Sequence, residues 1–201
     1  RLLLLPELDS RSPQLSPEQT AAAQTLVANT QSEGFCCSLL DGITGSGKTE
    51  VYFEAVAAAL KNNQQVLILL PEIALTTSFL DRFEERFGAP PAQWHSGLAP
   101  KMRERVWRQV ATGQVRVVAG ARSSLFLPFR ELGLIVVDEE HDSAYKQEDR
   151  VFYNARDMAV VRSSLGRFHC ILSSATPSVE TRVNAEAGRY DHVKMVKRHG
   201  E

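Results

Sequence analysis

Short apolar runs alternate with longer stretches of mixed polarity along most of the chain. The apolar runs are continuous, as in strands that are buried on both faces. They cover residues 35–40, 66–70, 115–119, 134–137 and 170–172. The stretches between them show helical patterns and cover residues 48–61, 77–87, 101–111, 155–164 and 178–187. This alternation predicts an α/β fold, with a mainly parallel sheet and helices on both of its faces.

Residues at the expected helix ends support this pattern. The sequence "SPEQ" at residues 16–19 has the side chains of a capping box, with Pro17 at the first helical position. It opens an Ala-rich stretch that predicts a further helix, running to about Asn29. Several expected helices end at glycines, which favour the left-handed conformation of a C-terminal cap: Gly88, Gly113, Gly166 and Gly188.

The beginning of the chain differs from the rest in composition. Prolines and serines recur in the first 15 residues, so we expect residues 1–15 to be a linker and residues 16–201 to form one domain. A length of 201 residues and an apolar content of 43% suit one well-buried domain and argue against a disordered or fibrous protein. The chain starts at Arg1 without a methionine, which suggests a piece of a longer protein.

Charge and cysteine content narrow the class of protein. There are 23 Lys and Arg against 24 Asp and Glu, so contact with nucleic acid must come from a local basic patch. The three cysteines, Cys36, Cys37 and Cys170, lack zinc-ligand spacing and are typical of a reducing compartment, which predicts a cytoplasmic location. No apolar stretch approaches the roughly 18 residues that span a bilayer, so we expect no membrane association.

A phosphate-binding motif lies between the first apolar run and a helical stretch. The sequence "GITGSGKT", residues 42–49, fits G-x-x-x-x-G-K-[ST] in the strand-to-helix context that this motif requires. Its glycines allow backbone N–H groups to curl around phosphate oxygens. Lys48 is expected to reach the β and γ phosphates, and Thr49 to bind Mg²⁺. The predicted nucleotide-binding glycines are Gly42, Gly45 and Gly47.

An acidic box, "DEEH" at residues 138–141, directly follows the apolar run at 134–137. With a phosphate loop present, Asp138 is expected to hold Mg²⁺, and Glu139 to polarise the water that attacks the γ phosphate. A zinc-protease motif would need a second histidine, and Val137 stands where one such motif requires it. A solvated acidic run would not usually follow a buried strand.

The identity of the base is less clear from the residues alone. No guanine-reading Asn-Lys-x-Asp motif is present, which argues against a GTPase. Gln19 lies upstream of the phosphate loop, where its amide could bind adenine. Because the capping box gives an equally adequate reason for Gln19, both interpretations stay open.

Six segments occur in the order of superfamily 2 helicase motifs. They are "GITGSGKTEVY", "PEIALT", "HSGL", "GARSSLFLPF", "DEEHDSAYKQ" and "SSATPS". From about Leu15 onward, the chain resembles the bacterial replication-restart helicases of this superfamily. The resemblance implies a RecA-like P-loop NTPase domain, the first of two helicase lobes, with ATP and Mg²⁺ as cofactors. The phosphate, metal and water-activating residues of that family correspond to Lys48, Thr49, Asp138 and Glu139 of this chain.

The resemblance also implies roles for residues outside the phosphate loop. Glu140 and His141 complete the family's acidic box, and Gln19 matches its adenine-side glutamine. Motif III, which links the nucleotide site to DNA, corresponds to Ser174, Ala175 and Thr176. Contacts to single-stranded DNA are implied for Pro71, Glu72, Thr76, Gly120, Arg122 and Ser123. The sequence departs from the family pattern "GTRSA" by having Ala121 and Ser124, which moves one hydroxyl by three positions.

Independent evidence for a DNA contact is weaker. Arg122 could bind a phosphate or pair with a surface carboxylate, and "SSATPS" could serve chemistry or simply form a turn. Aromatic and basic groups interleave after the acidic box: Tyr145, Lys146, Phe152, Tyr153 and Arg156. They could stack on bases and hold phosphates, or the aromatic rings could pack beneath the loop. The family's aromatic-rich coupling loop favours the first possibility.

What the resemblance implies for the whole protein is an ATP-dependent DNA helicase of 3′–5′ polarity. It would unwind forked DNA for replication restart and primosome assembly, together with primosome proteins and single-strand-binding protein, near the bacterial nucleoid. DNA-binding domains would precede residue 1, and zinc-binding cysteines and a second lobe with an arginine finger would follow residue 201. Without that finger, the chain should bind ATP weakly and hydrolyse it slowly.

Two other classes of protein share some of these features. A P-loop ATPase of another kind, such as a duplex DNA translocase that moves without unwinding, would carry the same phosphate loop and acidic box. A DNA-binding scaffold would need no nucleotide, and the intact Lys48 and Glu139 argue against it.

Overall fold

The computed structural model describes residues 13–149 and 151–198, which are built around a seven-stranded sheet. The strand order is β3-β4-β2-β5-β8-β1-β9, and every neighbouring pair is parallel. The strands are β1 (Cys36–Gly42), β2 (Gln65–Leu69), β3 (Ala92–Trp94), β4 (Val117–Gly120), β5 (Leu132–Asp138), β8 (His169–Ser174) and β9 (Asp191–Met195). A parallel sheet places the carboxyl ends of all its strands at one edge.

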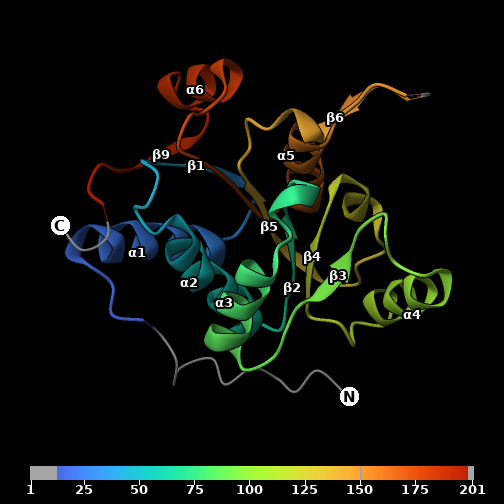
Figure 1. The fold of residues 1–201 in the computed structure, drawn as a ribbon. Helices are drawn as coiled ribbons and strands as arrows, with labels where there is room; N and C mark the ends of the chain where they lie inside the picture. The colour runs from blue at the N-terminus through green and yellow to red at the C-terminus, as the bar shows by residue number, and fades with distance from the viewer. Residues whose placement is uncertain (1–12, 150, 199–201) are drawn as a thin grey trace.

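Helices connect the strands (Figure 1). They are α1 (Pro17–Gln31), α2 (Lys48–Lys61), α3 (Thr77–Phe87), α4 (Pro100–Ala111), α5 (Ala155–Gly166) and α6 (Val179–Glu186). Short 3₁₀ turns and a small antiparallel hairpin complete the chain: η1 (Glu72–Ala74), η2 (Arg122–Phe126), η3 (Ser143–Tyr145), β6 (Lys146–Gln147) and β7 (Tyr153–Asn154). The predicted α/β class is confirmed, and the bounds of α2 and α3 are those predicted.

The sheet is buried on both faces because alternate residues of each strand enter different cores. In β2, Val66 and Ile68 pack with α1, α2 and α3, whereas Leu67 and Leu69 pack with α4 and α5. The first core includes a set of aromatic rings in edge contact around Phe53, whose ring centroid lies 5.5 Å from that of Phe83. Two-sided burial explains why the central strands are continuous apolar runs.

Two edge strands and one helix cap differ from the predictions. The pattern did not indicate β3 or β9, since both are short edge strands that mix polar and apolar residues. Gly166 was wrongly predicted to be a left-handed cap, because Arg167 takes that conformation with φ of 57°. A Cβ atom on Gly166 would lie 2.3 Å from the ring of Phe168, so close packing accounts for this glycine. Gly88, Gly113 and Gly188 do have positive φ.

All three cysteines are free, and Cys37 and Cys170 are buried side by side on β1 and β8. Among the helices of residues 13–149 and 151–198, none combines the length and apolar character that crossing a bilayer demands.

A buried histidine joins α1 to the amino ends of β1 and β8. Thr30 donates its hydroxyl proton to the carbonyl of Leu26, so it accepts a hydrogen bond from Nδ1 of His169 at 2.9 Å. The hydroxyl of Ser38 accepts from Asn29 and donates to Nε2 of His169 at 2.8 Å. These partners fix a neutral imidazole with its proton on Nδ1. Burial lowers the pKa of His169 to about 4.

This histidine should make folding pH-dependent. The unfolded chain binds a proton near the ordinary pKa of 6.5 but the folded chain only near about 4, so stability is lost as pH falls through this window. Between about pH 7.5 and pH 5, this group should lower the free energy of unfolding by about 2 kcal/mol. Urea denaturation at both pH values measures this loss. The His169→Gln variant should lack it, while the loop variant His95→Gln should retain it. An equal pH response in His169→Gln and the wild type would contradict the assignment.

Candidate functional site

The phosphate-binding motif forms the loop between β1 and α2. Gly45 and Gly47 have φ of 82° and 78°, a left-handed conformation that glycine adopts without steric cost. A Cβ atom on Gly42 would lie 2.6 Å from Oγ of Ser46, so only glycine fits there. Because no side chain caps the first turn of α2 at Gly47, the N–H groups of that turn remain available to an anion. Lys48 Nζ donates to the carbonyl of Gly42 at 2.7 Å.

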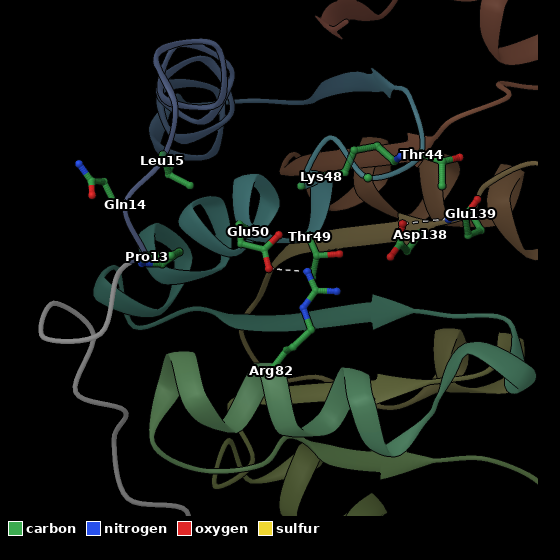
Figure 2. Close-up of a pocket in the computed structure, with 12 residues that line it drawn as sticks. Pro13, Gln14, Leu15, Thr44, Lys48, Thr49, Glu50, Arg82, Asp138 and Glu139 are labelled. Carbon is green, nitrogen blue, oxygen red and sulfur yellow. Dashed lines mark hydrogen bonds and ion pairs between the residues drawn. The ribbon is translucent and has the colours of Figure 1, made fainter. Parts of the chain in front are cut away.

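A cavity of about 460 Å³ lies beside this loop (Figure 2). Lys48 and Thr49 line it from α2, and Asp138 and Glu139 line it from the end of β5. The structure therefore brings together the predicted phosphate, metal and water-activating residues. The buried hydroxyl of Ser46 in the loop has no hydrogen-bond partner within the described chain. Free helix N–H groups and an ammonium group beside two carboxylates fit a phosphate chain with a divalent cation.

Asp138 is held in place by hydrogen bonds from two other elements. Oδ2 accepts from the hydroxyl of Tyr52 on α2 at 3.0 Å, and Oδ1 accepts from the hydroxyl of Ser173 on β8 at 2.9 Å. The backbone N–H of Glu139 also donates to Oδ1. Sequence reasoning missed Tyr52 and Ser173, although both lie inside the quoted motifs. These donors orient a carboxylate that could bind Mg²⁺ through its remaining lone pairs.

Glu139 lies at a sharp change of chain direction. Its backbone has φ of 48°, which is strained for a residue with a side chain. The side chain remains 43% exposed, and His141 Nδ1 lies 3.6 Å from its Oε2. Burial and the neighbouring charge of Asp138 raise the pKa of Glu139, while Lys48 and His141 oppose that change. The carboxylate is thus free of strong donors and faces the cavity, as a water-polarising group requires.

The third carboxylate of the box, that of Glu140, turns into the protein. It is 1% exposed and accepts hydrogen bonds from the backbone and hydroxyl of Ser178 and from the hydroxyl of Thr181. Arg156 Nη1 lies 3.3 Å from its Oε2 and forms a buried ion pair. Glu140 therefore joins the acidic box to the beginnings of α5 and α6.

The segment "SSATPS" contacts the acidic box at several points. Besides the hydrogen bond of Ser173 to Asp138, the hydroxyl of Ser174 lies 2.7 Å from Nδ1 of His141. The backbone N–H of Thr176 donates to the same hydroxyl at 2.9 Å. The segment is thus more than a turn, and the coupling role of His141, Ser174 and Thr176 stays a prediction.

The side chain of Gln19 contacts both the start of α1 and the phosphate loop. The predicted capping box is confirmed, since Oε1 accepts from the N–H of Ser16 and Oγ of Ser16 accepts from the N–H of Gln19. Its Nε2 also donates to the carbonyl of Ser46 in the phosphate loop at 2.9 Å. Gln19 is 1% exposed, so its amide supports the phosphate loop from the interior of the protein. A contact with adenine stays a prediction.

The residues predicted to contact DNA have varied surroundings. Thr76 caps α3 by accepting from the N–H of Phe79. Arg122 donates to the carbonyls of Ala144 and Lys146, and so holds the segment that follows the acidic box. Ser123 accepts from Nε1 of Trp94 at 3.1 Å. These hydrogen bonds give each of the three side chains a structural role. Contact of Thr76, Arg122 and Ser123 with a DNA backbone stays a prediction.

The shifted hydroxyl in "GARSS" is directed inward. Ser124 is fully buried and donates to the carbonyl of Ala121 at 2.6 Å. A Cβ atom on Gly120, at the end of β4, would lie 2.6 Å from the carbonyl oxygen of Trp94. This glycine therefore allows β3 and η2 to lie close to the end of β4. Ser124 therefore cannot replace a phosphate-contacting hydroxyl at position 121.

The aromatic residues after the acidic box separate into two groups. For Tyr145 the structure shows the alternative in which the ring packs beneath the loop, because it is 1% exposed and its hydroxyl donates to the carbonyls of Leu69 and Asp138. Phe152, in contrast, is 78% exposed. Tyr153 is half-buried in edge contact with Phe126, at 5.4 Å between ring centroids. Lys146 is exposed. A role of Tyr145 in coupling, from inside the core, stays a prediction.

This fold and this site define a RecA-like P-loop domain. Residues 16–184 match the family model of DEAD/DEAH box helicases, and the chain therefore belongs to that family. It is 49% identical, over 187 residues, to the Replication restart protein PriA of Rickettsia felis, covering 93% of this chain and 28% of that protein. Its identity to PriA of Bacillus subtilis is 39%, over 92% of this chain and 23% of the relative. The predicted resemblance to replication-restart helicases is confirmed, and the chain spans about a quarter of these relatives.

Solved structures support the fold. The structure of RecG bound to a three-way DNA junction superposes with a TM-score of 0.71 at 23% identity, over 94% of this chain and 24% of RecG. The Hef helicase domain of Pyrococcus furiosus gives a TM-score of 0.64 at 17% identity, over 98% of this chain and 40% of that chain. At these identities the likeness shows a shared RecA-like fold.

The buried carboxylate of Glu140 should contribute strongly to stability. The Glu140→Gln variant keeps the side-chain volume but leaves Arg156 without its buried counter-charge, so the free energy of unfolding should fall by about 3 kcal/mol. Urea denaturation measures this change. The Glu186→Gln variant removes an exposed carboxylate from α6 and should change stability by less than about 0.5 kcal/mol. If both variants have the stability of the wild type, the buried network is not stabilising.

Proposed function

We propose that the chain is the ATP-binding lobe of an ATP-dependent DNA helicase. The observation that carries this proposal is the meeting of the phosphate loop with Asp138 and Glu139 around one cavity. Membership of the DEAD/DEAH box helicase family supports ATP as the nucleotide and Mg²⁺ as the metal. The free N–H groups at the start of α2 suit the phosphates.

Each side chain has a distinct task in this proposal. Lys48 would exchange its hydrogen bond to Gly42 for the β and γ phosphates. Thr49 and Asp138 would hold Mg²⁺, which neutralises charge that develops on the phosphates. Glu139 would orient and polarise the attacking water, because it alone in the acidic box combines exposure to the cavity with few hydrogen-bond donors. Glu140 and His141 would keep the box in position.

The substrate and partners of the whole protein are inferred from its relatives. From the similarity to proteins named for replication restart, we infer that the whole protein unwinds forked DNA with 3′–5′ polarity in that process, in the bacterial cytoplasm near the nucleoid. RecG, which shares the fold, was solved on a DNA junction. Primosome proteins and single-strand-binding protein would be partners, and zinc would bind outside these residues. In the described part of the chain, no group of His, Cys, Asp and Glu forms a metal cluster.

The decisive experiment measures ATP hydrolysis by the full-length protein with and without forked DNA. The Glu139→Gln variant should bind ATP normally but lose at least about 100-fold in turnover, because water activation contributes that much or more. The Glu33→Gln variant, at an exposed carboxylate between α1 and β1, is a matched control and should hydrolyse ATP at the wild-type rate. Normal hydrolysis by Glu139→Gln would show that another group activates water.

Strand displacement separates a helicase from a duplex translocase. If the proposal holds, the full-length protein should release a labelled strand from forked DNA only with ATP, and Lys48→Ala should abolish release, since it removes the phosphate-binding ammonium. ATP-driven movement along duplex DNA without strand release would favour the translocase instead. The 201-residue chain alone should bind ATP weakly and turn it over slowly.

A further inference from the structure

The end of the cavity that lies away from Asp138 and Glu139 has a different chemistry. Pro13 and Leu15 line it before α1, and Glu50 from α2 and Arg82 from α3 lie between these residues and Asp138 (Figure 2). Glu50 and Arg82 form an ion pair. Because the carboxylate offsets the charge of the guanidinium, this side of the cavity is nearly neutral, whereas the opposite end carries Lys48, Asp138 and Glu139, the residues proposed to hold the phosphates and Mg²⁺.

A nearly neutral end with apolar walls suits the uncharged part of a nucleotide. The paired charges of Glu50 and Arg82 give a phosphate no net attraction, but a flat base can lie against Pro13 and Leu15 and present its face to the planar guanidinium of Arg82. Building on the proposed function, we propose that Arg82 forms one wall of the subsite for the base of the bound nucleotide. Glu50 is then a positioning residue, which holds the guanidinium beside the base.

The surroundings of Arg82 differ from those of a purely structural arginine. One turn further along the same two helices, Arg86 pairs with Glu54 at 3.0 Å and is 5% exposed. Arg86 also lies over the ring of Phe87, and so already fastens α3 to α2. The side chain of Arg82, by contrast, is 43% exposed and faces the cavity.

The helices behind Arg82 give it a fixed position. Phe53 on α2 packs against Phe83 and Phe87 on α3, with ring centroids 5.5 and 5.4 Å apart. Arg82 and Glu50 also line a smaller cavity of about 130 Å³ together with Phe53. The guanidinium therefore projects from a rigid base, which reduces the entropy lost when a ligand stacks on it.

Calorimetric titration of the 201-residue chain with two Mg²⁺-bound probes tests this assignment. ATP reports on the base and the phosphates together, and inorganic tripolyphosphate reports on the phosphates alone. Arg82→Ala should weaken ATP binding by about 5- to 20-fold and change tripolyphosphate binding by less than about 2-fold. Arg82→Lys should resemble Arg82→Ala towards ATP, since an ammonium lacks the planar face. Arg105→Ala, at an exposed arginine on α4, is the matched control and should bind both probes as the wild type does.

Three results would overturn the assignment. Unchanged ATP binding in Arg82→Ala would show that the side chain does not contact the nucleotide. Equal weakening for both probes would place Arg82 on the phosphates, and full recovery in Arg82→Lys would show that charge without a planar face suffices. If the wild-type chain binds neither probe, the proposed ATP-binding function itself fails, which is a separate outcome.

Discussion

The parallel direction of all seven strands is the constraint on which the candidate site depends. It places the carboxyl ends of β1, β2, β4, β5 and β8 at one edge of the sheet, so loops that are far apart in sequence meet there. Burial on both faces leaves this edge as the place where polar groups emerge from the core. Since β8 lies between β1 and β5, its Ser173 reaches Asp138 directly.

Three consecutive carboxylates have separate environments because the backbone changes direction between them. Asp138 ends a strand and is surrounded by donors, whereas Glu139 faces the cavity and Glu140 is buried against Arg156. The left-handed backbone of Glu139 produces this divergence at a cost in strain, which the ion pair and hydrogen bonds of Glu140 offset. The strain lies at the position proposed to activate water, where a precise orientation matters most.

Features that depend on local sequence patterns were predictable, whereas contacts between residues far apart in the sequence were not. The central strands, α2, α3 and the capping box of Ser16 were predictable because apolar periodicity and capping residues are local signals. The burial of Tyr145 was not predictable, since it depends on carbonyls of Leu69 and Asp138 that only the folded chain brings together. The hydrogen bond from Tyr52 to Asp138, likewise, links residues 86 positions apart.

The burial of Tyr145 gives the proposed coupling a physical route. Its hydroxyl holds the carbonyl of Asp138, and Arg122 holds the carbonyls of its neighbours Ala144 and Lys146. A displacement of the segment around Tyr145 must either break the buried hydrogen bonds of Tyr145 or move Asp138 together with the segment. Breaking them costs about 1–3 kcal/mol for each group left unpaired. If DNA binds the exposed hairpin that follows, a displacement therefore acts on the hydrogen bonds of Tyr145 and on those that hold Asp138 from Tyr52 and Ser173. The nucleotide site and the proposed DNA surface would therefore communicate through one core side chain, without an aromatic ring having to contact a base.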